Sequence, residues 1–305
     1  MSIATIIITV LGLCLFEIIS SIDNAIINAE VLSTMNKKAR QWFLVWGLFF
    51  AVIVVRGLLP WLIVWVASPD LGFFGAMTAT FSNDPKVLEA VERSAPILLI
   101  GGGTFLVFLF LHWLFLEPKN YGLVGEKYFH TKGVWFFAIV SVFLAGIVWL
   151  ALKENPLMAF GAVIGSTAFF ITHGFKQNAE ESEKQLLSTK MTDLSKIFYL
   201  EIIDATFSID GVLGAFAFTM SVPLIILGNG IGALVLRQVT MGNIERIKKY
   251  AYLKNGAMYS VLFLGIIMIL DSFHFEIPSW FSPAITFLVV IFFLIKSQNE
   301  LKIKK

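Results

Sequence analysis

The feature that most constrains this chain is a series of long apolar segments. A helix needs roughly 20 apolar residues to cross a hydrocarbon core of about 30 Å. Such segments lie near residues 3–33, 42–67, 94–116, 134–152, 156–173, 196–220, 222–242, 256–271 and 282–297. Apolar residue types make up 57% of the 305 residues, which excludes an ordinary water-soluble domain. We therefore expect an all-α fold, a polytopic bundle of about nine transmembrane helices in a single domain, 1–305.

The basic residues predict how these helices are oriented. Most Lys and Arg residues lie in or beside 32–41, 117–133, 174–195, 243–255 and the C-terminal tail. The alternate set of connections holds only Lys86, Arg93 and Lys153. The positive-inside rule then places the N-terminus outside and the C-terminus in the cytoplasm of a bacterial-type inner (plasma) membrane. A bundle of eight helices is the alternative, because segments 134–152 and 156–173 are almost continuous in the sequence. Eight helices would, however, place one of the basic connections outside the cytoplasm, against the positive-inside rule.

Composition and missing motifs exclude several function classes. Cys14 is the single cysteine, so the sequence offers neither a disulfide framework nor a thiolate metal site. The basic residues form no aromatic-studded patch, which argues against nucleic acid as a partner. The chain has no His-Glu-x-x-His, and it lacks the Gly-x-Gly-Asp expected of an intramembrane aspartyl hydrolase. We expect no enzyme and no cofactor, and we expect the lipid bilayer as the main partner.

Two segments of the chain repeat each other. FEIISSIDNAIINA in the first segment resembles LEIIDATFSIDGVLGAFA in the sixth, which aligns Glu17 with Asp204 and Asp23 with Asp210. The likeness continues through the next helix, where a glycine precedes Arg56 and Arg237 by the same spacing, and more weakly through the third. The repeat comprises 3–116 and 196–271, with linking spans at 134–173 and a cytoplasmic connection at 174–195. Because five helices separate the copies, they are expected to be inverted in the membrane, as in many transporters.

The repeated carboxylates are the candidate functional groups. Each ionised acid inside a bilayer costs about 2.5–3.5 kcal/mol on insertion scales, so a bound cation, protonation or arginine pairing must compensate. Oxygen ligands without histidine or cysteine suit Mn²⁺, Ca²⁺ or Mg²⁺ better than Zn²⁺. The candidate metal ligands are Glu17, Asp23, Asn24, Glu201, Asp204 and Asp210. The supporting residues are Ser21, Asn28, Ser208, Arg56 and Arg237. Purely structural pairing of these helices remains the alternative.

Helical spacing predicts how these residues face one another. Glu17, Ser21, Asn24 and Asn28 fall on one stripe, and Glu201, Asp204 and Ser208 fall on another, so the stripes can face each other. Asp23 and Asp210 each follow the preceding acid by six residues, which turns them about 120° away on an ideal helix. We therefore expect local unwinding in both copies, eased by Gly211 and Gly214 in the second; the alternative is that each Asp faces an arginine. The glycines from Gly101 to Gly103 predict close packing of their helix against a neighbour. A separate expectation is that His173 lies in or near a connection.

At these motifs the chain resembles the TerC superfamily, in particular the longer, uncharacterised-domain branch linked to tellurium-resistance clusters. The resemblance is carried by FEIISSIDNAIINAEVL, VVRGLLPWL, GGGTFLVFLFL, HGFKQNAEESEK, LEIIDATFSIDGVLGAFAFT, LGNGIGALVLRQVT and NGAMY, which extend over most of residues 10–265. The chain departs from the branch at Ile22 and Ile209, where an aromatic residue is common, and at Ser20 and Ser21. The resemblance implies an inner-membrane protein with Mn²⁺ export in characterised relatives, and it carries the acids over to Glu17, Asp23, Asn24, Asp204 and Asp210, with Glu201 typical of the branch.

The sequence thus favours a secondary transporter of a divalent cation. The resemblance makes Mn²⁺ export the first candidate, residue chemistry leaves Ca²⁺ open, and carboxylate protonation is a plausible coupling step. Resistance to metal or tellurite stress would follow. The alternative is a membrane scaffold or assembly factor with stress-response partners, in which the acids are structural.

Overall fold

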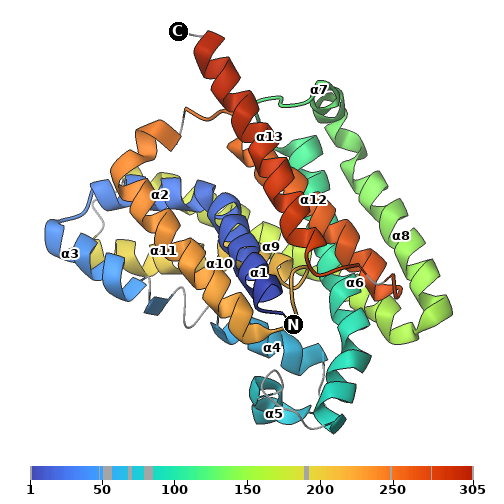
Figure 1. Cartoon of the computed structure of the whole chain (residues 1–305). Helices are drawn as coiled ribbons and strands as arrows, with labels where there is room; N and C mark the ends of the chain where they lie inside the picture. Colours follow the sequence, from blue (N-terminus) through green and yellow to red (C-terminus); the bar gives the residue numbers. More distant parts are fainter. Residues whose placement is uncertain are drawn as a thin grey trace.

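The computed structural model describes the chain except for residues 1, 48, 51–56, 68–70, 79–84, 189–191, 248, 276 and 304–305. For a further set of residues inside helices, Asp23 among them, it describes the backbone alone. Within the described ranges every regular element is helical, which confirms the predicted all-α bundle (Figure 1). The elements are α1 (Ile3–Ser20), α2 (Ile22–Ser33), α3 (Lys37–Trp42), the π-helical η1 (Phe43–Gly47), α4 (Leu59–Ala67), α5 (Gly72–Thr78), α6 (Pro85–Leu116), α7 (Val124–Thr131), the 3-10 turn η5 (Gly133–Trp135), α8 (Phe136–Glu154), α9 (Pro156–Ser188), α10 (Asp193–Ala215), α11 (Val222–Ile247), α12 (Leu253–Ser272) and α13 (Phe281–Ile303).

Among the described residues, six helical segments are long and apolar enough to cross a membrane, which confirms a polytopic membrane protein. They are Ile3–Ser20, Arg93–Leu116, Gly133–Glu154, Pro156–Gln177, Leu253–Ser272 and Phe281–Lys302. The predicted segment 42–67 lies partly outside the described residues, α11 contributes the shorter apolar stretch Val222–Gln238, and α10 carries the acids of the repeat. The spans at 134–152 and 156–173 are separate helices, because Asn155 is extended and its side chain accepts from the Leu157 amide at 2.9 Å while Pro156 opens α9.

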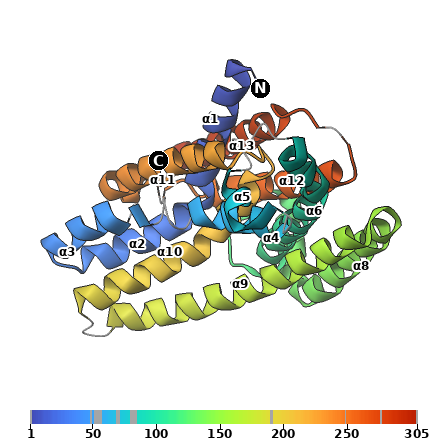
Figure 2. The ribbon, with the colours of Figure 1, turned by 90° about the horizontal axis from the view of Figure 1, so that it is seen from below.

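The first acid motif lies at a change of helix direction. α1 ends at Ser20 and α2 begins at Ile22, with Ser21 between them at φ −96° and ψ 6°. Both ribbon views show α2 leaving α1 at an angle (Figures 1 and 2). Ser21 donates its hydroxyl to Glu17 Oε1 at 2.8 Å, a side-chain hydrogen bond that links the two helices across this break.

The second acid motif is not unwound. α10 runs without a break from Asp193 through Asp210 and Gly211 to Ala215. The prediction of unwinding in both copies was therefore wrong for the copy that has the glycines. Those glycines serve close packing instead: a Cβ at Gly211 would lie 3.0 Å from Glu17 Oε2, and one at Gly214 would overlap the ring of Phe16.

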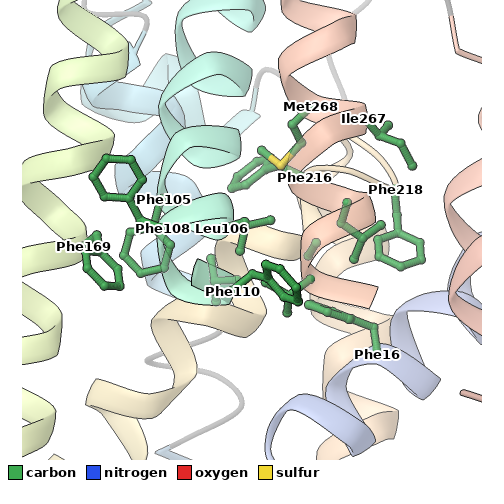
Figure 3. Packing of buried hydrophobic residues seen from close by; sticks show 14 of the residues in the cluster. Phe16, Phe105, Leu106, Phe108, Phe110, Phe169, Phe216, Phe218, Ile267 and Met268 are labelled. Atoms are coloured by element: carbon green, nitrogen blue, oxygen red, sulfur yellow. The ribbon is translucent and has the colours of Figure 1, made fainter. Parts of the chain in front are cut away.

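The centre of the bundle is α6, which packs on α9 and on α12. Figure 3 shows Phe105 and Phe108 of α6 against Phe169 of α9, with ring centroids 6.0 and 5.7 Å apart. Toward α12 a Cβ at Gly103 would lie 2.8 Å from the carbonyl oxygen of Gly265. The predicted close packing at the glycine triplet is confirmed, because only residues without a side chain let these backbones approach so closely.

Lys119 caps the C-terminal end of α6. The pH dependence of stability at this residue offers a test of the fold. Its ammonium donates to the carbonyl oxygens of Trp113 and Leu114 and lies 4.3 Å from the Trp113 ring centroid. Burial lowers the pKa of Lys119 to about 8, although the charges of Glu126 and Glu117 oppose the shift. The unfolded chain holds this proton up to about pH 10.4, so the contribution of Lys119 to stability should rise as pH increases from about 8 to 10.

We expect this rise to be about 1 kcal/mol, since the ammonium is only half-buried and solvent screens it. Denaturant titrations of the wild type and of Lys119→Met across this pH range would measure it. The difference in unfolding free energy between the two proteins should change with pH. A difference that stays constant from about pH 7 to 10 would show that the folded state does not depress this pKa.

Candidate functional site

The candidate site lies where α1 and α2 cross α10. Glu17 faces Gly211, whose Cβ position is 3.0 Å from Glu17 Oε2, and Asn24 faces Asp204. Along α1 and α2 the contacting residue number rises from 17 to 24, while along α10 it falls from 211 to 204. The first helices of the two copies therefore run antiparallel. Gly211 occupies in the second copy the position that Asn24 occupies in the first, as Asp204 matches Glu17. The two contacts are therefore equivalent under the sequence repeat, which is the relation that an inverted pair requires.

Hydrogen bonds tie this crossing together. Asn24 Nδ2 donates to Asp204 Oδ1 at 2.5 Å, and the hydroxyl of Ser21 donates to Glu17 Oε1 at 2.8 Å. Ser208, which matches Ser21 in the repeat, donates to the backbone carbonyl of Asp204 at 2.7 Å. All five of these side chains are buried. The predicted facing of the two polar stripes is thus seen in the structure.

Several buried oxygen atoms around the crossing lack a hydrogen-bond partner. They are Asn24 Oδ1 and Asn28 Oδ1 on α2 and, on α11, Asn229 Oδ1. Asn229 is fully buried and its amide nitrogen also lacks a partner. It lies three residues before Gly232, whose Cβ position is 2.7 Å from Glu17 Cβ. A buried amide without partners costs about 1–3 kcal/mol, so these groups are suited to a ligand.

Asn229 was missed by the analysis of the sequence. The signal that could have found it is an amide inside the apolar stretch Val222–Gln238, between two glycines of the repeated segment. Polar residues in such a stretch face the bundle interior and carry function more often than their neighbours.

Glu201 and Arg237 form the outer part of the site. Both carboxylate oxygens of Glu201 lack a hydrogen-bond partner, and the charges of Asp204 and Arg237 act on this acid. The guanidinium of Arg237 lies 4.7 Å from the ring centroid of Phe43, and Gly47 leaves room for Glu201 Oε1. Arg237 therefore lies near enough for its charge to act on Glu201 of α10.

Asp210 does not join this group. Its Oδ2 accepts from the ammonium of Lys176 on α9, and both side chains are largely buried. Asp210 is one residue from Gly211, which turns it about 100° around α10 and away from Glu17. The sequence placed Lys176 in the connection 174–195, but α9 continues as a helix to Ser188, so this lysine belongs to the bundle.

Two predicted residues cannot be placed in the site. The side chain of Asp23 and all of Arg56 lie outside the described residues. Within the part of the chain that the structure describes, no three His, Cys, Asp or Glu side chains are grouped closely enough to hold a metal ion. Any cation at this crossing would therefore depend on amide, hydroxyl or water oxygens besides carboxylates.

Known proteins place the chain among membrane proteins. It is similar to "Uncharacterized membrane protein YceF" of Bacillus subtilis (strain 168), with 24% identity over 166 residues, 53% of this chain and 63% of that protein. It is also similar to "Uncharacterized membrane protein RP786" of Rickettsia prowazekii (strain Madrid E), with 29% identity over 133 residues, 43% of each chain. The alignments thus span less than two thirds of either relative, and no solved structure matches the chain.

The family assignment covers nearly the whole chain. The model of the family described as "Protein of unknown function (DUF475)" matches residues 22–302, which include the whole second acid motif and the first motif from Ile22 onward, but not Glu17. These matches do not carry the TerC name, so that resemblance stays a prediction. With its apolar helices and its membrane-protein relatives, the chain is an integral membrane protein and belongs to the DUF475 family.

Proposed function

We propose that this protein is a secondary transporter of a divalent cation, which binds where α1 and α2 cross α10. The observation that carries the proposal is the pair of buried carboxylates, Glu17 and Asp204, set among buried oxygens without hydrogen-bond partners. Buried carboxylates are costly inside a membrane protein, and two of them at one helix crossing favour a doubly charged guest. The resemblance to TerC proteins makes Mn²⁺, moved outward, the first substrate to test.

The chemistry of the donor atoms supports a hard cation. Glu17 and Asp204 supply carboxylates, Ser21 supplies a hydroxyl, and Asn24 and Asn229 supply amide oxygens. Mn²⁺, Mg²⁺ and Ca²⁺ prefer such oxygen ligands. With only two carboxylates, binding would be weak enough for release, as transport requires.

Asn24 would act as a switch between the empty and the loaded site. In the structure its NH₂ group donates to Asp204, so its amide oxygen points elsewhere and has no partner. A cation beside Asp204 would repel the NH₂ group and attract the oxygen. Rotation of the amide by about 180° then exchanges a donor for a ligand without moving the backbone.

The inverted arrangement supplies the two access states that transport needs. The equivalent contacts, Asn24 with Asp204 and Glu17 with Gly211, are made by different chemical groups. The two halves are therefore similar in backbone but unequal in chemistry, and rocking one half against the other would open the crossing to each side in turn. The change of direction at Ser21 offers a hinge for this movement.

The test is flux through the purified protein in liposomes that contain a divalent-sensitive dye. Mn²⁺, Ca²⁺, Mg²⁺ and Zn²⁺ are supplied separately, and the wild type is compared with Glu17→Gln and Asp204→Asn. Each variant keeps the side-chain shape and removes one charge that would bind the cation. Loss of one charge-assisted contact is worth about 1.5–3 kcal/mol, so we expect the flux to fall roughly 10- to 100-fold.

Glu89→Gln is the matched control, because Glu89 is an exposed acid on α6 paired with Arg93 at 3.3 Å. It should transport as the wild type does. If folded wild-type protein moves none of the four ions, or if the two site variants move them as well as the control does, the transport proposal fails. The scaffold function would then be the one to pursue.

A further inference from the structure

A second polar cluster lies on the other side of α10 from the candidate site. Its members come from four helices that are far apart in the sequence. They are His112 and Glu117 at the end of α6, His173 and Lys176 on α9, Asp210 on α10 and Lys254 on α12. The candidate cation site does not include His112, His173, Glu117 or Lys254. The proposed function therefore leaves this cluster without a role.

The two histidines are the centre of this cluster. The ring centroids of His112 and His173 are 3.9 Å apart, and His112 Nδ1 lies 3.4 Å from Glu117 Oε1, an ion-pair distance without a hydrogen bond. Phe169 stacks on His173 at 5.8 Å with nearly parallel rings, and Phe136 meets His112 edge-on at 5.6 Å. Aromatic rings thus contact both histidines of the pair.

The cluster leads from the surface into the bundle. The side chains of Lys254 and Glu117 are 39% and 29% exposed, His112 is 10% exposed, and Lys176 and Asp210 are 13% and 15% exposed. The 2.8 Å ion pair between Lys254 and Glu117 is therefore the most exposed part of the cluster, whereas the pair between Lys176 and Asp210 is about as buried as His112. The histidines lie between these two ion pairs.

Charged side chains flank this histidine pair. The carboxylate of Glu117 lies beside His112, and the charge of Lys176 acts on His173. Two imidazolium rings in direct contact would repel each other strongly in such surroundings, so the pair has room for one positive charge rather than two.

We propose that His112 and His173 together form a proton-binding site, which takes up a single proton from the side of the membrane where Glu117 and Lys254 are exposed. Histidine is the side chain whose charge ordinarily changes near neutral pH. The proton site faces Lys176, and through the Lys176–Asp210 pair it reaches α10, which carries Asp204 about 120° around the helix from Asp210. This last link rests on the proposed cation transport, and it makes the pair the point at which protons modulate that transport.

The first test reads the protons directly and needs no transport. The chain has four histidines, so ¹⁵N-histidine labelling of the full-length protein in nanodiscs gives four imidazole signals to follow against pH. We expect one ring of the pair to become charged first and the other to resist, with midpoints separated by more than about one pH unit. In His173→Asn the remaining His112 should titrate in one step, and Glu117→Gln should lower the midpoint of the first step.

His130→Asn is the matched control, because His130 lies in α7 and contacts Tyr121 at 2.9 Å, outside the pair. It should leave both steps unchanged. If His112 and His173 titrate with the same midpoint, and neither variant alters the other ring, the proton site is refuted. Where a variant does not fold, the two midpoints of the wild-type protein are sufficient to decide between these outcomes.

A second measurement tests the link to transport. Cation flux of the wild type should depend on pH between about 5 and 8, and this dependence should be lost in His173→Asn but kept in His130→Asn. A pH dependence that survives in His173→Asn overturns the link while leaving the proton site to the NMR result. Absence of flux in the wild type at every pH refutes the proposed function and with it the link, whereas the NMR titration still decides whether the proton site exists.

Discussion

Replacing Asp210 by asparagine should lower the free energy of unfolding by about 3–5 kcal/mol, the cost of breaking a buried ion pair from one side. Asp210 Oδ2 accepts from the Lys176 ammonium, and both side chains are largely buried between α9 and α10. Asparagine keeps the shape of the side chain but offers this cation no charge. The variant also distinguishes two roles for Asp210, because the sequence predicts a metal ligand whereas the structure shows an ion pair.

Reversible unfolding by sodium dodecyl sulfate, followed by tryptophan fluorescence, would measure this change. The double variant Lys176→Met/Asp210→Asn removes both charges and should recover most of the lost stability, since an apolar replacement of a buried pair is often neutral. Glu89→Gln removes one partner of an exposed pair and should cost less than about 1 kcal/mol. If Asp210→Asn unfolds as the wild type does but transports no cation, the acid is a ligand and the ion pair is incidental.

Introducing alanine at Gly165 should also be strongly destabilising, by about 3 kcal/mol or more, because it overpacks a backbone contact. A Cβ at Gly165 on α9 would overlap the carbonyl group of Gly101 on α6, and one at Gly161 would lie 2.7 Å from the carbonyl oxygen of Ile97. The new atom meets backbone rather than a flexible side chain. The two helices would have to separate, which would also disturb the neighbouring Phe105, Phe108 and Phe169 packing.

Gly174→Ala on the same helix is the control for this prediction. A Cβ at Gly174 has open space around it, so alanine there should be neutral or stabilise the helix by up to about 1 kcal/mol. Thermal unfolding in detergent would compare the two variants. Equal unfolding temperatures would mean that α6 and α9 do not approach as closely as the structure shows.

Much of the fold follows from the sequence for a physical reason. A segment of about 20 apolar residues is stable in lipid only as a helix, because every backbone group must bond within the segment. Length and composition therefore predicted the membrane helices, and six of the nine meet the requirement in the described chain. The Asn155–Pro156 break is equally local, since proline prevents α8 from continuing into α9.

Half of the candidate site also follows from the sequence. The repeat predicted that Glu17 and Asp204 belong to equivalent helices, and helical periodicity predicted that Asn24 shares a stripe with Glu17. The structure brings Asn24 to Asp204 at 2.5 Å and Glu17 to Gly211. Both predictions need only the period of an α-helix and the alignment of the two repeated segments. A single sequence supplies both.

Only the tertiary structure decided which charges meet. Asp210 looks equivalent to Asp23 in the sequence, but its partner Lys176 is set by the rotation of α10 and by how far α9 extends, which depend on packing against several helices. Only the structure likewise shows that the helix breaks at Ser21 and continues through Gly211, where α1 needs the space. His112 and His173 likewise meet across α6 and α9 because glycines bring these two backbones together. Sequence determined which segments enter the membrane, since hydrophobic burial depends on composition, while polar partners depend on geometry that only the assembled helices define.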